Sequence, residues 1–420
     1  MLVRLKTLKE VDDLIQRTNL MESEENRIQV LCDHYYSPEI RTDAPPTAPE
    51  YRQLIMGIYA HIRGTPDGVY APEIDEKSPF VEKANVFCTG GPYNYQSSAF
   101  VGEFLIAYGF ILKCMAMRAG MRVIEYGPGS GQILLHLARV GCQVTAVDIE
   151  PQYLDIIQTQ ATAMGLNTEV LCGSFGAAPV GAPPYDAVLF FEAFHHCLEH
   201  QQLINQLHDI VTASGQVVFA GEPIIGANDY WRPVIPYPWG PRLDLLSLRA
   251  TRTYGWLELG FQEEYFVRLL LRNGWFVRKY RCSLTARGDT WIAKENHGVW
   301  SPGITELPSD EAETWHEPEG EFVWTKQLSV MTLDGRMRWE RVSIECKNPL
   351  PFSKTIKFKI GSQERTVLAS PGQQFDVEFP LAAGVERILA ICCEESVPRR
   401  LGINEDGRGL GITVYRVVYA

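Results

Sequence analysis

The sequence has little positive charge and no long apolar run, and both absences exclude classes of protein. Lysine and arginine number 39 against 51 aspartate and glutamate, which gives a formal net charge of -12. This balance disfavours nucleic acid as a partner, because affinity for phosphate comes mostly from basic side chains. The most apolar helical stretch, residues 104–112, is too short to span a bilayer, and the N-terminus lacks the apolar core of a signal peptide. We therefore expect a cytoplasmic protein without a membrane span.

The sequence also lacks paired cysteines. Its ten cysteines are scattered, and none belongs to a C-x-x-C motif. Most of them lie in apolar runs, as in VLCGS and ILAICCEE. Buried thiols in a reducing compartment are the expected state of such cysteines.

Changes in composition divide the 420 residues into four parts. Residues 1–97 have apolar positions spaced among charges, which predicts a helical N-terminal cap. Residues 98–300 alternate apolar runs with helical patterns. Residues 301–321 are acidic and carry three prolines, the composition of a linker. Residues 322–420 have strand-like runs about a dozen residues apart with turn signals between them, which predicts a β-sandwich.

The second part has the pattern of an α/β fold. Five apolar runs predict strands at 122–126, 143–149, 168–172, 186–191 and 215–220. Single helical segments, for example 151–164 and 199–212, lie between them. Such alternation favours a doubly wound parallel sheet of the Rossmann-like kind, covered by helices. The segments 276–284 and 290–294 would close this sheet as a final pair of strands.

A glycine-rich loop follows the first of these strands, in VIEYGPGSGQ at residues 123–132. Gly127, Gly129 and Gly131 allow a ligand to approach the backbone closely. Glu125 precedes them, and a carboxylate would repel a phosphate but attract a cationic ligand. Asp148 ends the next strand, where an acid can accept hydrogen bonds from both hydroxyls of a ribose. The pattern therefore predicts a nucleoside-like ligand that carries positive charge.

These motifs together resemble the S-adenosylmethionine-binding half of the class I methyltransferases, over residues 120–295. The resemblance implies S-adenosylmethionine as cofactor and an enzyme that transfers its methyl group. It also implies that Glu125, Gly127, Gly129 and Gly131 contact the methionine part of the cofactor. Asp148 and Ile149 would then hold the ribose and one adenine face, and Ser174 and Phe175 would flank the adenine. Glu192 would lie beside the reactive methyl group. The family often has Asp where this chain has Ser174, which would meet the adenine amino group as a neutral acceptor.

The stretch FEAFHHCLEH, residues 191–200, follows the fourth strand at the edge where open α/β sheets bind ligands. We predict that His195 or His196 removes the proton of the methyl acceptor, with Glu192 nearby as a third catalytic residue. One of the two histidines could instead be a hydrogen-bonded packing residue. His196 and His200 are four residues apart and would suit a metal on one helix face, but no third ligand is evident. We therefore predict no metal site.

A long insertion at 222–256 carries aromatic residues and arginines. Such residues suit a pocket for a polar, flat-faced acceptor such as a sugar, with Tyr230, Trp231 and Arg232 as contacts. The alternative is a lid packed on its own aromatic side chains. The stretch GGPYNYQSS at residues 90–98 would fold over the cofactor, with Tyr95 as a contact.

The segment 398–414, PRRLGINEDGRGLGITV, resembles the closing motif P-x-x-L-G-x-x-x-D-x-R-x-L-G of β-rich modules in bacterial polysaccharide-biosynthesis proteins. This resemblance directs the expected acceptor towards a sugar hydroxyl or a glycan. We thus expect a methyltransferase with a small-molecule or glycan acceptor, no nucleic-acid partner and a possible homo-oligomer. Two alternatives stay open. The chain could methylate O, N or C of a small aromatic or lipid metabolite, or it could be a non-catalytic glycan-binding scaffold with a vestigial cofactor pocket.

Overall fold

The structure, a computed structural model, describes residues 2–38, 42–65, 70–78, 91–381 and 387–420. The chain divides into two compact units. The first comprises Met1–Gln262 with Lys279–Ile292, and the second comprises Glu263–Arg278 with Ala293–Ala420. The division passes through strands β11 (Trp275–Tyr280) and β12 (Thr290–Glu295), so it does not follow the predicted boundaries near residues 300 and 321.

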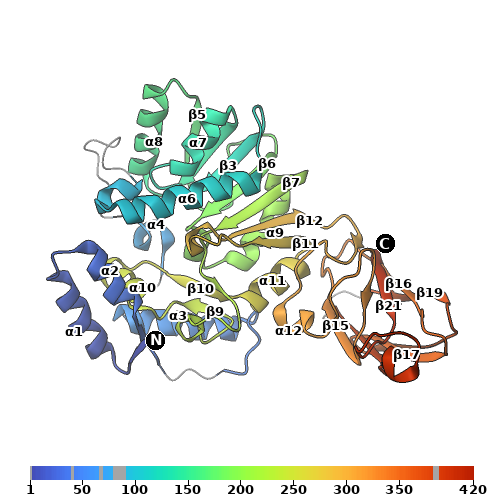
Figure 1. The fold of residues 1–420 in the computed structure, drawn as a ribbon. Coiled ribbons are helices and arrows are strands. Elements are labelled where there is room, and N and C mark those ends of the chain that lie inside the picture. The colour runs from blue at the N-terminus through green and yellow to red at the C-terminus, as the bar shows by residue number, and fades with distance from the viewer. Residues whose placement is uncertain (1, 39–41, 66–69, 79–90, 382–386) are drawn as a thin grey trace. The chain divides into compact units, whose positions relative to one another are not determined.

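A seven-stranded sheet, most of which belongs to the first unit, has the strand order β11-β12-β7-β6-β3-β4-β5 (Figure 1). Five of its strands lie wholly in the first unit: β3 (Arg122–Tyr126), β4 (Gln143–Asp148), β5 (Thr168–Cys172), β6 (Tyr185–Phe191) and β7 (Val211–Ala220). All neighbouring pairs among these five strands are parallel. The predicted α/β fold with a parallel sheet is therefore confirmed, and the predicted strand positions hold to within a few residues.

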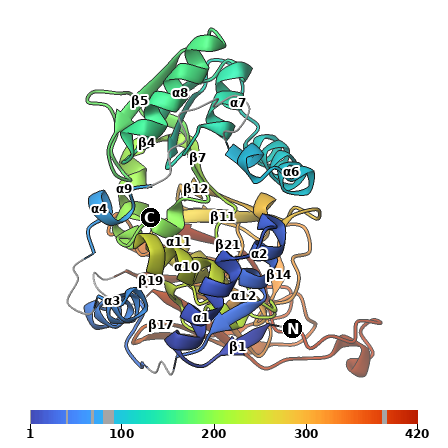
Figure 2. The ribbon, with the colours of Figure 1, turned by 90° about the vertical axis from the view of Figure 1, so that its left-hand side faces the viewer.

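Helices cover both faces of this sheet, as the two views show (Figures 1 and 2). They are α6 (Ser98–Met115), α7 (Gln132–Val140), α8 (Pro151–Ala163) and α9 (His200–Ile210). One hydrophobic cluster joins α6, α7 and α8 to alternate residues of the strands, while α9 packs on β6 and β7. Parallel strands need this double cover because both of their faces are apolar.

Helix α6 is long and apolar enough to span a membrane by length and composition. Its inner face is nevertheless committed to the core, because Ala107, Tyr108 and Ile111 are buried against the sheet. Core helices of this kind pass the same test of length and hydropathy, so the observation is weak evidence for a span.

The N-terminal segment packs on the insertion that follows β7. The segment contains β1 (Val3–Leu5), α1 (Leu8–Asn19), α2 (Glu24–Cys32), β2 (His34–Tyr36), α3 (Pro49–Arg63) and α4 (Pro72–Asp75). The insertion contains β8 (Ile224–Ile225), β9 (Trp239–Pro241), α10 (Leu245–Tyr254) and β10 (Leu259–Gln262). Arg252 donates to Asp12 at 2.5 Å, and the hydroxyl of Tyr51 donates to the carbonyl of Trp239 at 2.9 Å. Much of the insertion's aromatic and basic content therefore serves packing.

The second unit contains two antiparallel sheets around one hydrophobic core. The five-stranded sheet contains β13 (Val299–Trp300), β14 (Val323–Trp324), β16 (Arg341–Lys347), β19 (Gln374–Pro380) and β21 (Thr413–Tyr419). The four-stranded sheet contains β15 (Leu328–Thr332), β17 (Lys354–Ile360), β18 (Gln363–Ala369) and β20 (Ile388–Cys393). The core includes inward-facing residues of both sheets, such as Ile344 and Phe358.

Residues 301–321, predicted as a linker, pack as part of this second unit. They contain helix α12 (Ser309–Ala312), and Trp315 after it is buried in the core. Arg268 of α11 (Glu263–Arg272) donates to Asp310 at 2.8 Å and to Glu311 at 3.1 Å. The acidic residues that suggested a linker instead form hydrogen bonds with Arg268 and with strand β15.

Candidate functional site

The glycine loop joins β3 to α7, and all three glycines have left-handed backbones. Their φ angles are 64° at Gly127, 52° at Gly129 and 79° at Gly131. A Cβ at Gly131 would lie 2.7 Å from Ile157, and one at Gly127 would lie 2.9 Å from the Cβ of Ala193. A Cβ at Gly129 would meet nothing within 4 Å. Packing thus explains two of the glycines, whereas Gly129 keeps free space open beside the loop.

Glu125 is buried in β3, just before this loop. Its side chain is 2% exposed, and Oε2 has no hydrogen-bond partner among the described residues. Burial raises the pKa of this carboxyl to about 8. An unpaired buried carboxyl oxygen is costly unless a ligand supplies a donor. The site therefore fits a cationic group such as an amine.

Asp148 lies at the end of β4, next to the same loop. Its Oδ1 accepts a hydrogen bond from the backbone of Glu150 at 2.8 Å. Burial raises its pKa to about 6, although the backbone donors lower it. This carboxylate is held in place by its own turn and lies at the carboxyl edge of the sheet, where the prediction placed a ribose.

Most of the predicted cofactor residues surround a single cavity of about 590 Å³. The predicted residues that line it are Gly127, Gly129, Asp148, Ile149, Ser174, Phe175, Glu192 and His196. A second cavity of about 230 Å³ is lined by Glu125, and Gly127, Gly129 and Glu192 border both. Gly131 lines neither of the two cavities, in line with its packing against Ile157. Tyr95 lies in a 3-10 turn, and its side chain is outside the described part of the chain.

Glu192 follows the last residue of β6 and has a left-handed backbone with φ 49°, which is unusual for a residue with a side chain. Its carboxylate pairs with Arg287, and its backbone amide donates to Ala220 at 3.0 Å. Gly221 makes room for it, because a Cβ there would lie 2.9 Å from the Cγ of Glu192. The strained backbone thus holds an arginine-paired carboxylate between the two cavities.

His195 is buried and held by Glu222, a residue that the sequence analysis did not select. Its Nδ1 lies 2.8 Å from Oε2 of Glu222. Glu222 also accepts hydrogen bonds from the backbone amides of Ala193 at 2.9 Å and Phe194 at 2.8 Å. Burial alone would raise the pKa of Glu222, but His195 and these donors lower it. One carboxylate therefore fixes both the turn η2 (Phe194–His196) and the orientation of the His195 ring.

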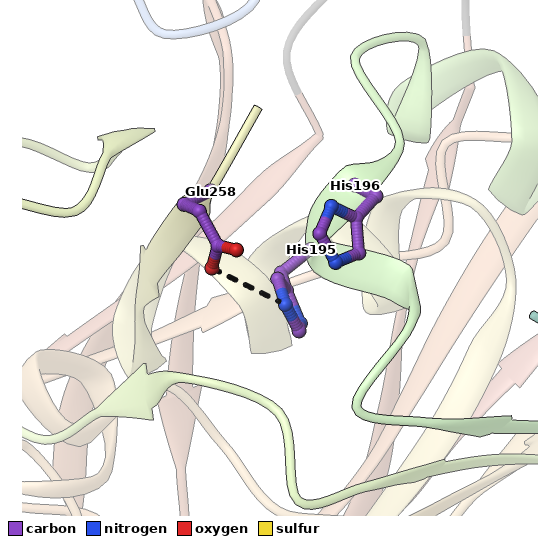
Figure 3. A group of neighbouring side chains, drawn as sticks. All are labelled: His195, His196 and Glu258. Carbon is purple, nitrogen blue, oxygen red and sulfur yellow. Dashed lines mark ion pairs between the residues drawn. The ribbon is translucent and has the colours of Figure 1, made fainter. Parts of the chain in front are cut away.

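His196 lines the larger cavity and pairs with a different carboxylate from that of His195. Its Nδ1 lies 2.9 Å from Oε2 of Glu76. Burial lowers the pKa of His196, but Glu76, Glu258 and Glu222 raise it to about 9. Figure 3 shows the two histidines beside Glu258, whose Oε2 lies 3.6 Å from Nε2 of His195. The centroids of the two imidazole rings are 4.3 Å apart.

His200 has a structural role and does not share a helix face with His196. His196 ends the turn η2, whereas His200 begins α9. Nδ1 of His200 lies 3.2 Å from the carbonyl of Leu198, and its ring packs on Trp239 and Phe261. Burial lowers its pKa to about 4, so the ring is neutral at physiological pH.

Tyr230, Trp231 and Arg232, predicted to contact the acceptor, line neither of the two cavities described above. Tyr230 is 69% exposed, and its ring contacts that of Trp231. Arg232 donates to the carbonyl of Ile225 at 3.1 Å. Within the insertion it is instead Trp256 that lines the larger cavity. Aromatic residues stabilise packing as readily as they bind a ligand, so the composition of the insertion does not by itself identify the residues that line a cavity.

Comparison with known proteins agrees with this geometry. Residues 123–215 match the family model of a methyltransferase domain. This stretch is a methyltransferase domain. It contains the glycine loop, Asp148, Glu192 and both histidines. The predictions of a methyltransferase and of S-adenosylmethionine as its cofactor are confirmed at the level of this domain.

Curated relatives align over part of the chain. An uncharacterized protein of Mycobacterium bovis is 28% identical over 150 residues, which are 36% of this chain and 53% of that protein. A ubiquinone biosynthesis O-methyltransferase of Methylocella silvestris is 32% identical over 80 residues, 19% of this chain and 31% of that enzyme. The chain thus spans about half the length of the first relatives it matches.

Solved structures resemble this chain more distantly. The magnesium protoporphyrin IX methyltransferase of Synechocystis, solved with bound S-adenosylhomocysteine, has 18% identity and a TM-score of 0.34. The alignment covers 47% of this chain and 86% of that one. The 1,6-didemethyltoxoflavin-N1-methyltransferase of Burkholderia thailandensis has 14% identity and a TM-score of 0.36. Its alignment covers 61% of this chain and 93% of that one.

Proposed function

We propose that the whole chain is an S-adenosylmethionine-dependent methyltransferase that methylates a hydroxyl of a sugar or a glycan-related acceptor. The observation that carries the proposal is the buried carboxyl oxygen of Glu125, which has no hydrogen-bond partner among the described residues, beside a glycine loop whose central position is open. A carboxylate in that place suits an amino group and would repel a phosphate. The methyltransferase domain at residues 123–215 supports the same assignment.

The residues around the two cavities fit the cofactor part by part. Glu125 would hold the amino group, and Gly127 and Gly129 would let the methionine part lie against the backbone. Asp148 would accept hydrogen bonds from the ribose, while Ile149, Ser174 and Phe175 would flank the adenine. When bound, the cofactor supplies a methyl group on a positively charged sulfur, activated for transfer.

At the acceptor end, we propose that Glu192, His195 and His196 act on the group to be methylated. Glu192 borders both cavities and is fixed by Arg287, so it can orient the acceptor beside the methyl group. His196 lines the larger cavity, and Glu222 and Glu76 hold the two imidazole rings in place. Fixed groups of this kind promote transfer by orienting the acceptor and activating its oxygen.

The lining of the larger cavity favours a sugar as acceptor. It combines four aromatic side chains, Tyr70, Tyr153, Phe175 and Trp256, with the polar side chains of Arg52, Glu73, Gln202 and Gln206. Sugars offer apolar faces to aromatic rings and hydroxyls to polar groups, so this combination of side chains supports a sugar as acceptor.

We further propose that the second unit is a β-sandwich module of the polysaccharide-biosynthesis type, which contributes acceptor or partner contacts. Its closing motif contains an ion pair between Arg408 and Asp406 at 2.6 Å, and Arg408 also reaches Glu319 at 2.6 Å. These contacts hold the loop before β21 in place, so these residues of the motif also have a structural role.

Calorimetric titration with S-adenosylmethionine, S-adenosylhomocysteine and NAD tests the cofactor. We expect the first two to bind and NAD not to bind. Mass spectrometry of sugar nucleotides and oligosaccharides incubated with protein and cofactor then tests the acceptor, through the mass gain of one methyl group. If the protein binds the cofactor but methylates only aromatic or lipid metabolites, the acceptor belongs to one of those classes and the proposed sugar acceptor is wrong. No cofactor binding would leave a non-catalytic scaffold.

A further inference from the structure

We propose that His195, His196 and Glu258 form a binding site for a divalent transition-metal ion. One potential ligand atom of each residue lies within 4.8 Å of those of the other two (Figure 3). Two imidazoles with one carboxylate are a recurrent ligand set for Zn²⁺ and for other ions of this class. Glu258 lies just before β10, 62 positions after His196 in the sequence, so only the fold brings the three together.

The surroundings of the two rings match those of metal-bound histidines. Nδ1 of His195 lies 2.8 Å from Glu222, and Nδ1 of His196 lies 2.9 Å from Glu76. The hydrogen bond to Glu222 fixes the proton of His195 on Nδ1 and leaves its Nε2, 3.6 Å from Oε2 of Glu258, with the lone pair. A carboxylate behind each imidazole is the usual outer arrangement of a metal site, because it orients the ring and raises its basicity.

The charge of the cluster also favours a cation. Three carboxylates, those of Glu76, Glu222 and Glu258, surround the rings with side-chain exposures of 7%, 0% and 12%. Arg242 is the nearest arginine to Glu258 at 3.8 Å, but its Nε is already bonded to Asp244 at 3.0 Å. Buried carboxylates at this density need compensating positive charge. A divalent ion between the three ligands would supply it.

The inference rests on the proposed function and gives the histidine pair a definite role. His196 lines the larger cavity, and three protein ligands leave coordination positions open for a further oxygen. An acceptor hydroxyl bound there would have a lowered pKa, as oxygens bound to such ions do. The two rings would then be ligands, and the activation of the acceptor predicted for a histidine base would come from the ion.

Metal titration of the full-length protein tests the site. The protein is freed of metal with a chelator and titrated with Zn²⁺ by calorimetry. It is then titrated with Co²⁺, whose visible absorption reports the geometry of its ligands. We expect one high-affinity site per chain. His195→Ala, His196→Ala and Glu258→Gln should abolish it, whereas Glu222→Gln should weaken Zn²⁺ binding by ~10- to 100-fold. His61→Ala, an exposed histidine of α3, is the matched control and should bind as the wild type does.

Circular dichroism and cofactor titration of each variant separate loss of metal from loss of fold. Equal Zn²⁺ affinity in wild type and in His195→Ala and Glu258→Gln, or no binding by the folded wild type, would overturn the metal site. Full methyl transfer by chelator-treated wild type would also overturn the role given to the ion, while leaving the methyltransferase proposal intact. Absence of cofactor binding in the wild type would defeat that proposal instead, and the Zn²⁺ titration would still decide the site.

Discussion

The carboxylate of Glu222 lies 2.8 Å from Nδ1 of His195 and also accepts hydrogen bonds from the backbone amides of Ala193, Phe194 and His195. A single fully buried side chain thus closes the turn after β6 and orients the first histidine. Glu222 itself follows the end of β7, the next strand of the sheet. The geometry of the proposed active site therefore depends on a contact between two adjacent strand ends.

The first prediction concerns this contact. Glu222→Ala would leave three backbone donors and a buried imidazole without their partner. We expect the free energy of unfolding to fall by about 3 kcal/mol or more, because each buried donor left without its acceptor costs about 1–3 kcal/mol. Urea denaturation measures the change. Glu103→Ala, at an exposed position of α6, is the control and should stay within about 0.5 kcal/mol of wild type. Equal stability of the two variants would contradict the role given to Glu222.

The second prediction concerns the open position in the glycine loop. In Gly129→Val, the new side chain would enter the space that Gly129 leaves free and would strain a backbone at φ 52°. We expect affinity for S-adenosylmethionine to fall at least ~10-fold, about 1.4 kcal/mol, in calorimetric titration. Gly165→Val carries a similar strain at φ 67° away from both cavities and should keep the wild-type affinity. Unchanged affinity in a folded Gly129→Val would rule out the loop as the cofactor site.

The third prediction concerns pH. Burial raises the pKa of Glu125 from its ordinary 4.5 to about 8, so the folded protein binds more protons than the unfolded chain between these values. Stability should therefore fall as pH rises from about 4.5 to about 8, by a few kcal/mol at ~1.4 kcal/mol per pKa unit. Glu125→Gln removes this contribution. Urea unfolding at about pH 5 and about pH 8 should show a smaller decline in the variant than in the wild type, and identical declines would contradict the assignment.

The fourth prediction concerns the histidine pair. His195→Ala and His196→Ala should each bind S-adenosylmethionine within a few-fold of wild type, because we assign the cofactor contacts to the glycine loop and Asp148. At least one of them should lose ~100-fold or more in methyl-transfer rate. Initial rates on an acceptor found by the mass screen measure this, with His61→Ala as control. Near-wild-type rates in both single variants would remove the pair from the reaction.

Local sequence patterns predicted much of the first unit. The alternation of apolar runs gave the strand positions, and the order of Glu125, the glycine loop and Asp148 along the chain placed them at one sheet edge. This succeeds because consecutive parallel strands end on the same side, so residues after each strand converge. Within the described part of the chain, the residues predicted at these strand ends line the larger cavity, and their contacts with the cofactor stay a prediction.

The partners of the histidines could not be predicted in this way. Glu76 and Glu258 come from two other segments of the chain, as does Arg287, the partner of Glu192, and no periodicity links any of them to residues 191–200. The acidic stretch 301–321 was wrong as a linker, because its acids pair with Arg268 and with β15 in the fold. Glu222 had a usable signal, since it follows β7 at the same edge as Glu192 follows β6.

Cofactor titration of wild type and Glu125→Gln tests the central claim most directly. The buried Oε2 of Glu125 has no partner among the described residues, and the account assigns it to the amino group of S-adenosylmethionine. We predict one binding site per chain in the wild type and an affinity at least ~10-fold lower in Glu125→Gln. Both proteins should give the same circular dichroism. Equal affinity of the two proteins, or a folded wild type that does not bind the cofactor, would contradict the account.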